Sequence, residues 1–250
     1  MDAGRFAGLT AIVTGSGSGI GRATAMRIAA EGGRVVVSDL RAERVAETVT
    51  LIEDAGGSAV GVPGDITSQE HVDALVAACD GRVDVLVNNA GIMDAFLPVG
   101  ELDDATWNRV LDVNLTAPMR MTRAVLPLMT AAGRGTIVNV ASEASLRAGA
   151  SGTAYTVSKH GVLGLTRSTA LFYKGLGIRC NAVLPGAVRT NIEAPFHSPM
   201  AAGVLGPLMQ VIPGVAEPDD LAAAICWLAS ADSANVTGAL LPSDGGWSTI

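Results

Sequence analysis

The stretch TAIVTGSGSGIG, residues 10–21, decides the fold of this chain. A short strand pattern at 9–13 leads into a turn rich in glycine, and a helical pattern follows from about Gly19 to Glu31. A buried strand, a glycine turn and a helix in this order open a βαβ unit, whose second strand runs parallel to the first. The stretch therefore predicts an α/β fold.

The same alternation continues to the end of the chain. Further strands are expected at 34–38, 58–62, 83–87, 136–140, 178–183 and 239–241, and helices near 42–55, 68–79, 104–131, 154–174 and 218–230. Because the strand segments are almost continuously apolar, both faces of the sheet should be covered. Residues 1–250 are thus predicted to form a single α/β domain, a doubly wound (Rossmann-type) parallel sheet of about seven strands with helices on both faces.

Composition narrows the classes of function. A net charge of −7 argues against nucleic acid as a partner, because phosphate binding needs a basic footprint. The apolar runs are shorter than the roughly 20 residues that span a bilayer, and the N-terminus lacks a signal-peptide pattern. No His, Cys or acidic cluster has metal-ligand spacing. We expect a cytoplasmic protein without a metal site that acts on a small molecule.

The glycine turn is predicted to bind a dinucleotide. Glycines at 15, 19 and 21 let the backbone approach a pyrophosphate, which the N–H groups of the new helix would bind. The spacing is G-xxx-G-x-G, unlike the common G-x-G-x-x-G or a P-loop. The expected contacts are Gly15, Ser18, Gly19, Ile20 and Gly21, and the alternative is a purely structural loop.

Asp39 ends the second strand, 18 residues after Gly21. A carboxylate there can accept hydrogen bonds from the adenosine ribose hydroxyls and would repel a 2′-phosphate. Arg41 keeps NADP possible as the cofactor. Ser18, however, is uncharged and offers no contact to a 2′-phosphate, so NAD is favoured. The alternative role for Asp39 is an N-cap of the following helix.

Two further strand ends carry residues suited to the same cofactor. Asp65 and Ile66 follow the third strand, where the carboxylate could accept from an adenine amino group. Asn89, Ala90 and Gly91 follow the fourth and supply small side chains and an amide. Each group alone could be ordinary turn chemistry, but together they mark successive strand ends on one edge of the sheet.

Tyr155 and Lys159 are four residues apart on an expected helix, so they share one face. A nearby ammonium, helped by an oxidised nicotinamide, would lower the tyrosine pKa from its usual value near 10. Ser142 follows the fifth strand and could hydrogen-bond a substrate oxygen. The three residues therefore predict proton transfer beside a nicotinamide.

With these motifs, the chain resembles the short-chain dehydrogenase/reductase family, in its compact single-domain branch. The resemblance rests on TG-xxx-GIG at 14–21, NNAG at 88–91, Asn114, Ser142, YTVSK at 155–159 and Pro185-Gly186. It implies that Tyr155 is the general acid/base and that Lys159 binds the nicotinamide ribose and lowers the tyrosine pKa. Ser142 would polarise the substrate oxygen, and Asn114 would hold a water that links Lys159 to solvent.

The resemblance also implies a contact with the nicotinamide carboxamide from Pro185, Gly186, Val188 and Thr190. Beside it stands a physical expectation for Asn114. Because Pro118 lacks an N–H, the helical bond to the Asn114 carbonyl cannot form, and that carbonyl could accept from the relay water. The alternative is that Pro118 only kinks a long helix.

An insert at about 191–214 is expected to cover the substrate. Its only ionisable residues are Glu193 and His197, which suits a lid over an uncharged, lipophilic secondary alcohol or ketone. The alternative for the insert is an oligomer contact. Glu143 and Arg147 are expected to line the pocket, while His71 and His160 should lie on helix surfaces.

The family also sets the alternatives. An NADPH-dependent 3-oxoacyl (carrier protein) reductase is disfavoured by Asp39 and the acidic surface, and a non-catalytic NAD-binding sensor would not need the Ser/Tyr/Lys set. The apolar C-terminal residues 243–250 contain a Trp, and relatives usually bury this end against a neighbour, so a homotetramer is expected.

Overall fold

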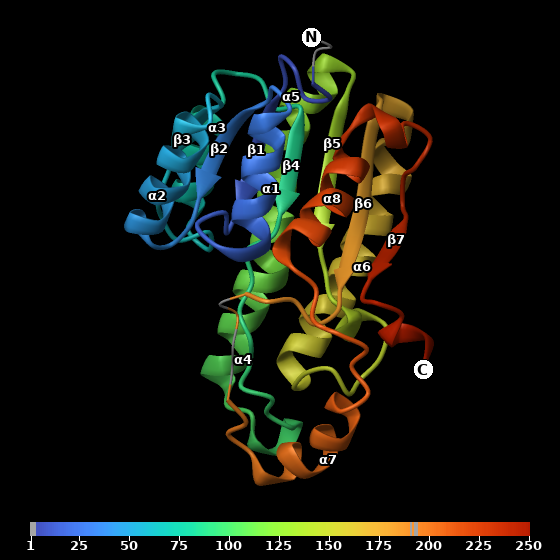
Figure 1. Cartoon of the computed structure of the whole chain (residues 1–250). Coiled ribbons are helices and arrows are strands. Elements are labelled where there is room, and N and C mark those ends of the chain that lie inside the picture. The colour runs from blue at the N-terminus through green and yellow to red at the C-terminus, as the bar shows by residue number, and fades with distance from the viewer. Residues whose placement is uncertain (1–3, 191, 193–194) are drawn as a thin grey trace.

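Figure 1 shows the computed structural model of the chain, which describes residues 4–190, 192 and 195–250. Its seven strands form one parallel sheet in the order β3-β2-β1-β4-β5-β6-β7. They are β1 (Thr10–Thr14), β2 (Arg34–Ser38), β3 (Ser58–Gly61), β4 (Val85–Asn88), β5 (Gly135–Val140), β6 (Ile178–Pro185) and β7 (Leu240–Ser243). The strand order reverses between β1 and β4, which is the point where doubly wound sheets bind ligands.

Helices cover both faces of the sheet, as predicted. The main helices are α1 (Gly19–Ala30), α2 (Ala42–Asp54), α3 (Gln69–Ala77), α4 (Asp104–Leu111), α5 (Ala117–Ala132), α6 (Thr153–Tyr173), α7 (Pro199–Met209) and α8 (Pro218–Ala229). On β1, Val13 packs in the cluster formed with α1, α2 and α8, while its neighbour Ile12 packs in the cluster formed with α3, α5 and α6. Successive residues of a strand point to opposite faces, so a strand buried on both faces must be apolar throughout.

The long helix expected at 104–131 is two helices with a wide turn between them. α4 ends at Leu111, a π-helical turn spans Asp112–Thr116, and α5 begins at Ala117 with Pro118 in its first turn. Proline is tolerated there because the first helical N–H groups have no intrahelical partner. The π-helical turn carries Asn114, and such turns are frequent at functional sites.

The carboxyl ends of the strands point toward the end of the molecule that holds α4 and α7 (Figure 1). α7 lies within the insert, for which no helix was expected from the sequence. Asn191 and Glu193 of that insert are outside the described residues. In the described part of the chain, no helix is long and apolar enough to cross a bilayer.

Candidate active site

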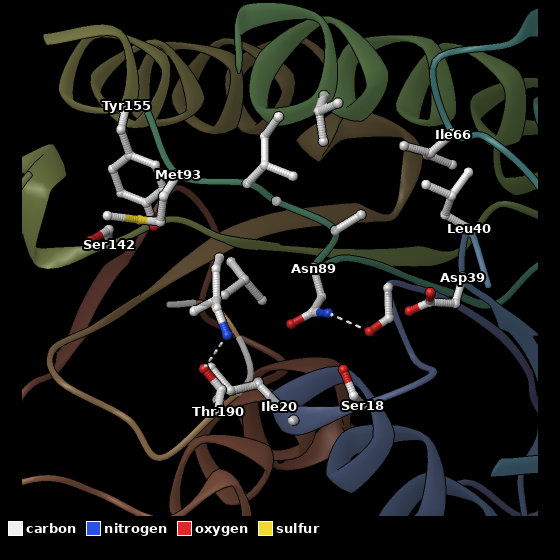
Figure 2. A pocket seen from close by; sticks show the side chains of 18 of the residues that line it. Ser18, Ile20, Asp39, Leu40, Ile66, Asn89, Met93, Ser142, Tyr155 and Thr190 are labelled. Atoms are coloured by element: carbon white, nitrogen blue, oxygen red, sulfur yellow. Dashed lines mark hydrogen bonds between the residues drawn. The ribbon is translucent and has the colours of Figure 1, made fainter. Parts of the chain in front are cut away.

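A cleft of about 610 Å³ runs along the carboxyl ends of the strands. Figure 2 shows Asp39, Leu40 and Ile66 at one end of it, and Ser142, Tyr155 and Met93 at the other. The predicted residues that line this cleft are Gly15, Ser18, Gly19, Ile20, Asp39, Asp65, Ile66, Asn89, Ala90, Gly91, Ser142, Tyr155, Lys159, Pro185, Gly186, Val188 and Thr190. Of the predicted site residues, only Gly21 and Asn114 do not line the cleft.

The glycine loop is held against β4 by side-chain and backbone contacts. Asn89 Nδ2 donates to the carbonyls of Thr14, at 2.9 Å, and Gly15, at 3.1 Å. Gly15 has a φ of +64°, and a Cβ there would lie 2.9 Å from the Cα of Ala90. A Cβ on Gly21 would lie 2.3 Å from the Gly15 carbonyl oxygen, so Gly21 permits close packing behind the loop. The loop thus presents bare backbone to the cleft, which suits an approaching pyrophosphate.

Asp39 supports the glycine loop and does not cap α2. One carboxylate oxygen accepts from Gly17 N at 3.3 Å, and the other accepts from Arg41 N at 3.1 Å. The N-cap of α2 is Arg41, which makes no side-chain cap. Because a carboxylate has about four acceptor positions, two remain for hydroxyl donors in the cleft.

A buried histidine lies behind Ser38 and Gly64, which line this end of the cleft. His71 is only 7% exposed, and its Nε2 lies 3.0 Å from Ser38 Oγ, while burial lowers its pKa. The expectation of a surface residue is therefore wrong for His71, because the face of α3 that carries it packs against Ser38 and Gly64. His160 is exposed as expected.

Lys159 is a buried cation without an anionic partner among the described residues. It is 4% exposed, and its Nζ donates to the Val140 carbonyl at 2.9 Å. Burial lowers the pKa of Lys159 to about 8. A Cβ on Gly91 would come within 3.5 Å of this Nζ, so the glycine leaves room beside the ammonium. Two N–H donors of Lys159 stay available to a ribose hydroxyl in the cleft.

Tyr155 lies beside Ser142 at the same end of the cleft (Figure 2). Burial raises the pKa of Tyr155 to about 12, the Ser142 hydroxyl acts to lower it, and the charge of Asp94 raises it further. The predicted lowering by Lys159 is absent in the protein alone, because Nζ lies 5.5 Å from the Tyr155 ring centroid and donates to Val140 instead. The positive charge of an oxidised nicotinamide would work in the lowering direction.

The Asn114 side chain is fully engaged with the segment after β4. Its Oδ1 accepts from Ile92 N at 2.8 Å, and its Nδ2 donates to the Ile92 carbonyl at 2.9 Å and to Ser158 Oγ at 3.2 Å. The amide therefore fixes the backbone next to Gly91. A relay water at this residue would need the main-chain carbonyl, which is the group that Pro118 was expected to leave unbonded.

Glu143 and Arg147 are not pocket residues, contrary to expectation. The Glu143 side chain is fully buried and pairs with Arg147, whose guanidinium lies 5.3 Å from the Trp247 ring centroid and donates to the Ile250 carbonyl. Trp247 is 5% exposed within its own chain. The pair therefore anchors the C-terminal segment behind Ser142, and the tryptophan needs no neighbouring subunit to cover it.

The sequence did not indicate several cleft residues. They are Leu40, Arg44, Ile92, Met93, Ala95, Arg109 and Val113, among others, whereas Ile192 and Pro195 belong to the insert that was expected to cover the substrate. The segment 92–95 directly follows the predicted NNAG contact, so its position was a usable signal. Arg109 reaches the cleft from α4 and has no local pattern that would have identified it.

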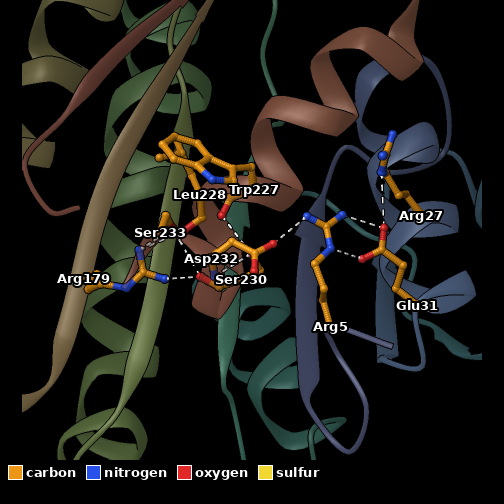
Figure 3. Close-up of polar contacts among 9 residues, drawn as sticks. All are labelled: Arg5, Arg27, Glu31, Arg179, Trp227, Leu228, Ser230, Asp232 and Ser233. Carbon is orange, nitrogen blue, oxygen red and sulfur yellow. Dashed lines mark hydrogen bonds and ion pairs between the residues drawn. The ribbon is translucent and has the colours of Figure 1, made fainter. Parts of the chain in front are cut away.

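A smaller cavity of about 480 Å³ lies at the opposite edge of the sheet, beside Arg179. Arg179 donates to the Leu228 and Ser230 carbonyls at 3.0 and 2.9 Å and to Ser233 Oγ at 2.9 Å (Figure 3). These contacts join β6 to the end of α8, so the guanidinium has a structural role. No group of metal-binding side chains occurs in the described part of the chain.

Comparison with known proteins agrees with this geometry. The family model described as short chain dehydrogenase matches residues 9–200. Cis-4-hydroxycyclohexanecarboxylate dehydrogenase of Sinomonas cyclohexanicum is 41% identical over 248 residues, covering 98% of each chain. 3beta-Hydroxysteroid dehydrogenase 2 of Eggerthella lenta is 38% identical over 251 residues, covering 97% of this chain and 96% of that one.

A solved structure from Beutenbergia cavernae, a candidate NAD(P)-dependent gluconate 5-dehydrogenase with bound NADP at low occupancy, superposes with a TM-score of 0.87. It is 39% identical, and 98% of each chain is covered. The chain belongs to the short-chain dehydrogenase/reductase family and is an NAD(P)-dependent oxidoreductase that acts on CH–OH groups.

Proposed function

We propose that the enzyme transfers a hydride between NAD and a lipophilic secondary alcohol or its ketone, with Tyr155 as the proton carrier. The observation that carries the proposal is the arrangement of side chains along the cleft at the strand ends. Ser142, Tyr155 and Lys159 meet at one end, and Asp39 lies at the other, with the glycine loop between them. A dinucleotide laid along the loop would bring its nicotinamide to the tyrosine end.

In the direction of oxidation, the bound cofactor supplies the hydride acceptor. Tyr155, as phenolate, would take the hydroxyl proton of the alcohol, while Ser142 holds the same oxygen by a hydrogen bond. Lys159 would hold the nicotinamide ribose with its remaining donors and favour the phenolate by its charge. Asn114 would act indirectly, because it fixes the backbone at Ile92 and keeps Gly91 close to Lys159.

The preference for NAD rests on Asp39. Its unpaired acceptor positions suit two ribose hydroxyls, and its charge would repel a 2′-phosphate at the same place. Arg41 and Arg44 line this end as well and work in the opposite direction. The Asp39 carboxylate is held in place by its bonds to Gly17 N and Arg41 N, which supports the preference for NAD.

The substrate is proposed to be an uncharged alicyclic secondary alcohol. Met93 lies beside Tyr155 (Figure 2), and the cleft lining also contains the apolar residues Ala95, Val188, Ile192 and Pro195. Two relatives are named for ring alcohols, a hydroxysteroid and a hydroxycyclohexanecarboxylate. We expect the enzyme to work in the cytoplasm as a homotetramer, and the insert at 191–214 to act as a lid over the substrate.

The test is NAD(P)H absorbance with a panel of cyclohexanols and 3-hydroxysteroids, each with NAD and with NADP. Tyr155→Phe is the diagnostic variant, and Tyr173→Phe, the chain's other tyrosine on the same helix, is its matched control. The proposal expects turnover with NAD, its loss by roughly 10³-fold or more in Tyr155→Phe, and wild-type rates in Tyr173→Phe. NAD binding without turnover of any alcohol or ketone would favour the sensor alternative.

A further inference from the structure

The helix that carries Tyr155 begins without a side-chain cap of its own. Its N-cap is Gly152, so the first turn of α6 has no local side chain to accept from its free N–H groups. Asp94, from the segment after β4, supplies the missing acceptor. Its Oδ2 accepts from the backbone N–H of Tyr155 at 2.9 Å, the third residue of the helix and the usual target of an N-cap.

Asp94 is buried and its other oxygen is also used. It is 1% exposed, and its Oδ1 accepts from Phe96 N at 3.1 Å. No cation pairs with it among the residues that the structure describes. A carboxylate buried without a cation needs such N–H donors, and the positive end of a helix stabilises it further. The two backbone donors therefore hold the carboxylate in one place.

The same turn reaches the substrate side of the cleft. Ala95 and Phe96 have φ values of +56° and +59°, a conformation that non-glycine side chains adopt rarely. The turn places the Phe96 ring 4.5 Å from that of Phe196, in the segment before α7. It also joins the catalytic helix a second time, because Thr153 N donates to the Leu97 carbonyl at 2.9 Å.

We propose that Asp94 is a positioning residue for Tyr155, which fixes the first turn of α6 at the tyrosine itself and joins it to the Phe96–Phe196 contact of the substrate segment. The charged groups beside the Tyr155 side chain among the described residues are Asp94, from the loop after β4, and Lys159, from α6. The charge of Asp94 opposes the phenolate. The loop carboxylate thus fixes the position of the tyrosine, while its charge lowers the fraction of Tyr155 that is ionised.

Two variants separate the charge of Asp94 from its position. Asp94→Asn removes the charge and turns an N–H₂ group toward one of two backbone donors. Gly152→Ala keeps the charge, but the new Cβ would lie 2.5 and 2.6 Å from the two carboxylate oxygens and 2.5 Å from Leu97 N, so it would displace the carboxylate together with the turn that carries it. The φ of Gly152 is −75°, so the alanine backbone itself is unstrained. Asp103→Asn is the matched control, because Asp103 caps α4 through Thr106 N away from Tyr155.

The experiment is the pH profile of kcat and kcat/KM for alcohol oxidation, with NAD affinity measured separately. Asp94→Asn should lose about tenfold or more in kcat through misplacement of the tyrosine, and the acid limb of its profile should move to lower pH. Gly152→Ala should lose kcat with a smaller movement of that limb. NAD affinity should stay at the wild-type value in both, and Asp103→Asn should keep the wild-type profile.

A purely structural role predicts a lower melting temperature with a wild-type profile. Wild-type kcat and pH profile in folded Asp94→Asn, or wild-type kcat in folded Gly152→Ala, would overturn the inference. It rests on the proposed role of Tyr155, and Tyr155→Phe separates the two. An active Tyr155→Phe enzyme would overturn that role, whereas an inactive one beside a wild-type-like Asp94→Asn would overturn only the role of Asp94.

Discussion

The buried charge of Lys159 is expected to lower the free energy of unfolding of the enzyme. The ammonium is buried, and its pKa falls from the ordinary 10.5 to about 8. At about 1.4 kcal/mol for each pKa unit, this difference corresponds to roughly 3 kcal/mol of unfavourable burial at pH 7. Lys159→Met keeps the length of the side chain, removes the charge and gives up the hydrogen bond to Val140, which is worth about 1 kcal/mol.

The net expectation for Lys159→Met is therefore a gain of about 2 kcal/mol in the free energy of unfolding at pH 7. For a chain of this size the melting temperature should rise by roughly 4–8 °C. The folded-state pKa is the lower one, so the wild type bears the full burial cost below pH 8. That cost declines as the pH rises through 8 and vanishes near 10.5, where the unfolded lysine also loses its proton.

The assay is thermal unfolding without cofactor at pH 7 and pH 10, together with alcohol turnover. Lys174→Met is the control, since Lys174 is the chain's other lysine and is exposed. We expect Lys159→Met to be more stable at pH 7, to lose that advantage at pH 10, and to have little activity. The reasoning would be refuted if Lys159→Met were less stable than the wild type at pH 7. It would also be refuted if the difference in melting temperature between these two proteins did not shrink at pH 10.

Three further outcomes are expected. Asp39→Ser should raise the NADP to NAD ratio of kcat/KM by about tenfold or more, because the charge that opposes a 2′-phosphate is gone, and an unchanged ratio would remove the argument for NAD. Arg179→Met should lose about 3 kcal/mol in urea unfolding, since it removes the guanidinium bonds to the Ser230 and Leu228 carbonyls and leaves the Ser233 hydroxyl as the side-chain donor that the two share, and a wild-type midpoint would contradict this. Pro118→Ala should lower turnover modestly without loss of NAD binding if its missing N–H serves the relay at Asn114; unchanged turnover would count against that role.

The layered sheet was predictable because its signals are local. Each strand is an apolar run, and burial on both faces leaves no polar alternation, so β1, β2 and β5 fall within a residue or two of the expected ranges. The π-helical turn at Asp112–Thr116 was not predictable from helical periodicity, which continues through it. α7 was missed because its sequence is apolar on all sides and so gives no amphipathic period.

The cleft was largely predictable for a related reason. Residues at strand carboxyl ends meet on one edge of the sheet, so Asp39, Asn89 and Ser142 could be assigned to one cleft from their positions alone. Contacts between distant segments could not. Whether His71 faces water or Ser38 depends on how α3 packs, and the link from Asp94 to Tyr155 joins residues 61 apart with no shared motif.

The central claim is hydride transfer from a secondary alcohol to NAD at Tyr155. Its most direct test uses an alicyclic alcohol deuterated at the carbinol carbon and mass spectrometry of the reduced dinucleotide. The account predicts one deuterium in the NADH formed by the wild-type enzyme, and almost none formed by Tyr155→Phe in the same time. Unlabelled NADH from the wild type, or labelled NADH at the wild-type rate from Tyr155→Phe, would contradict it.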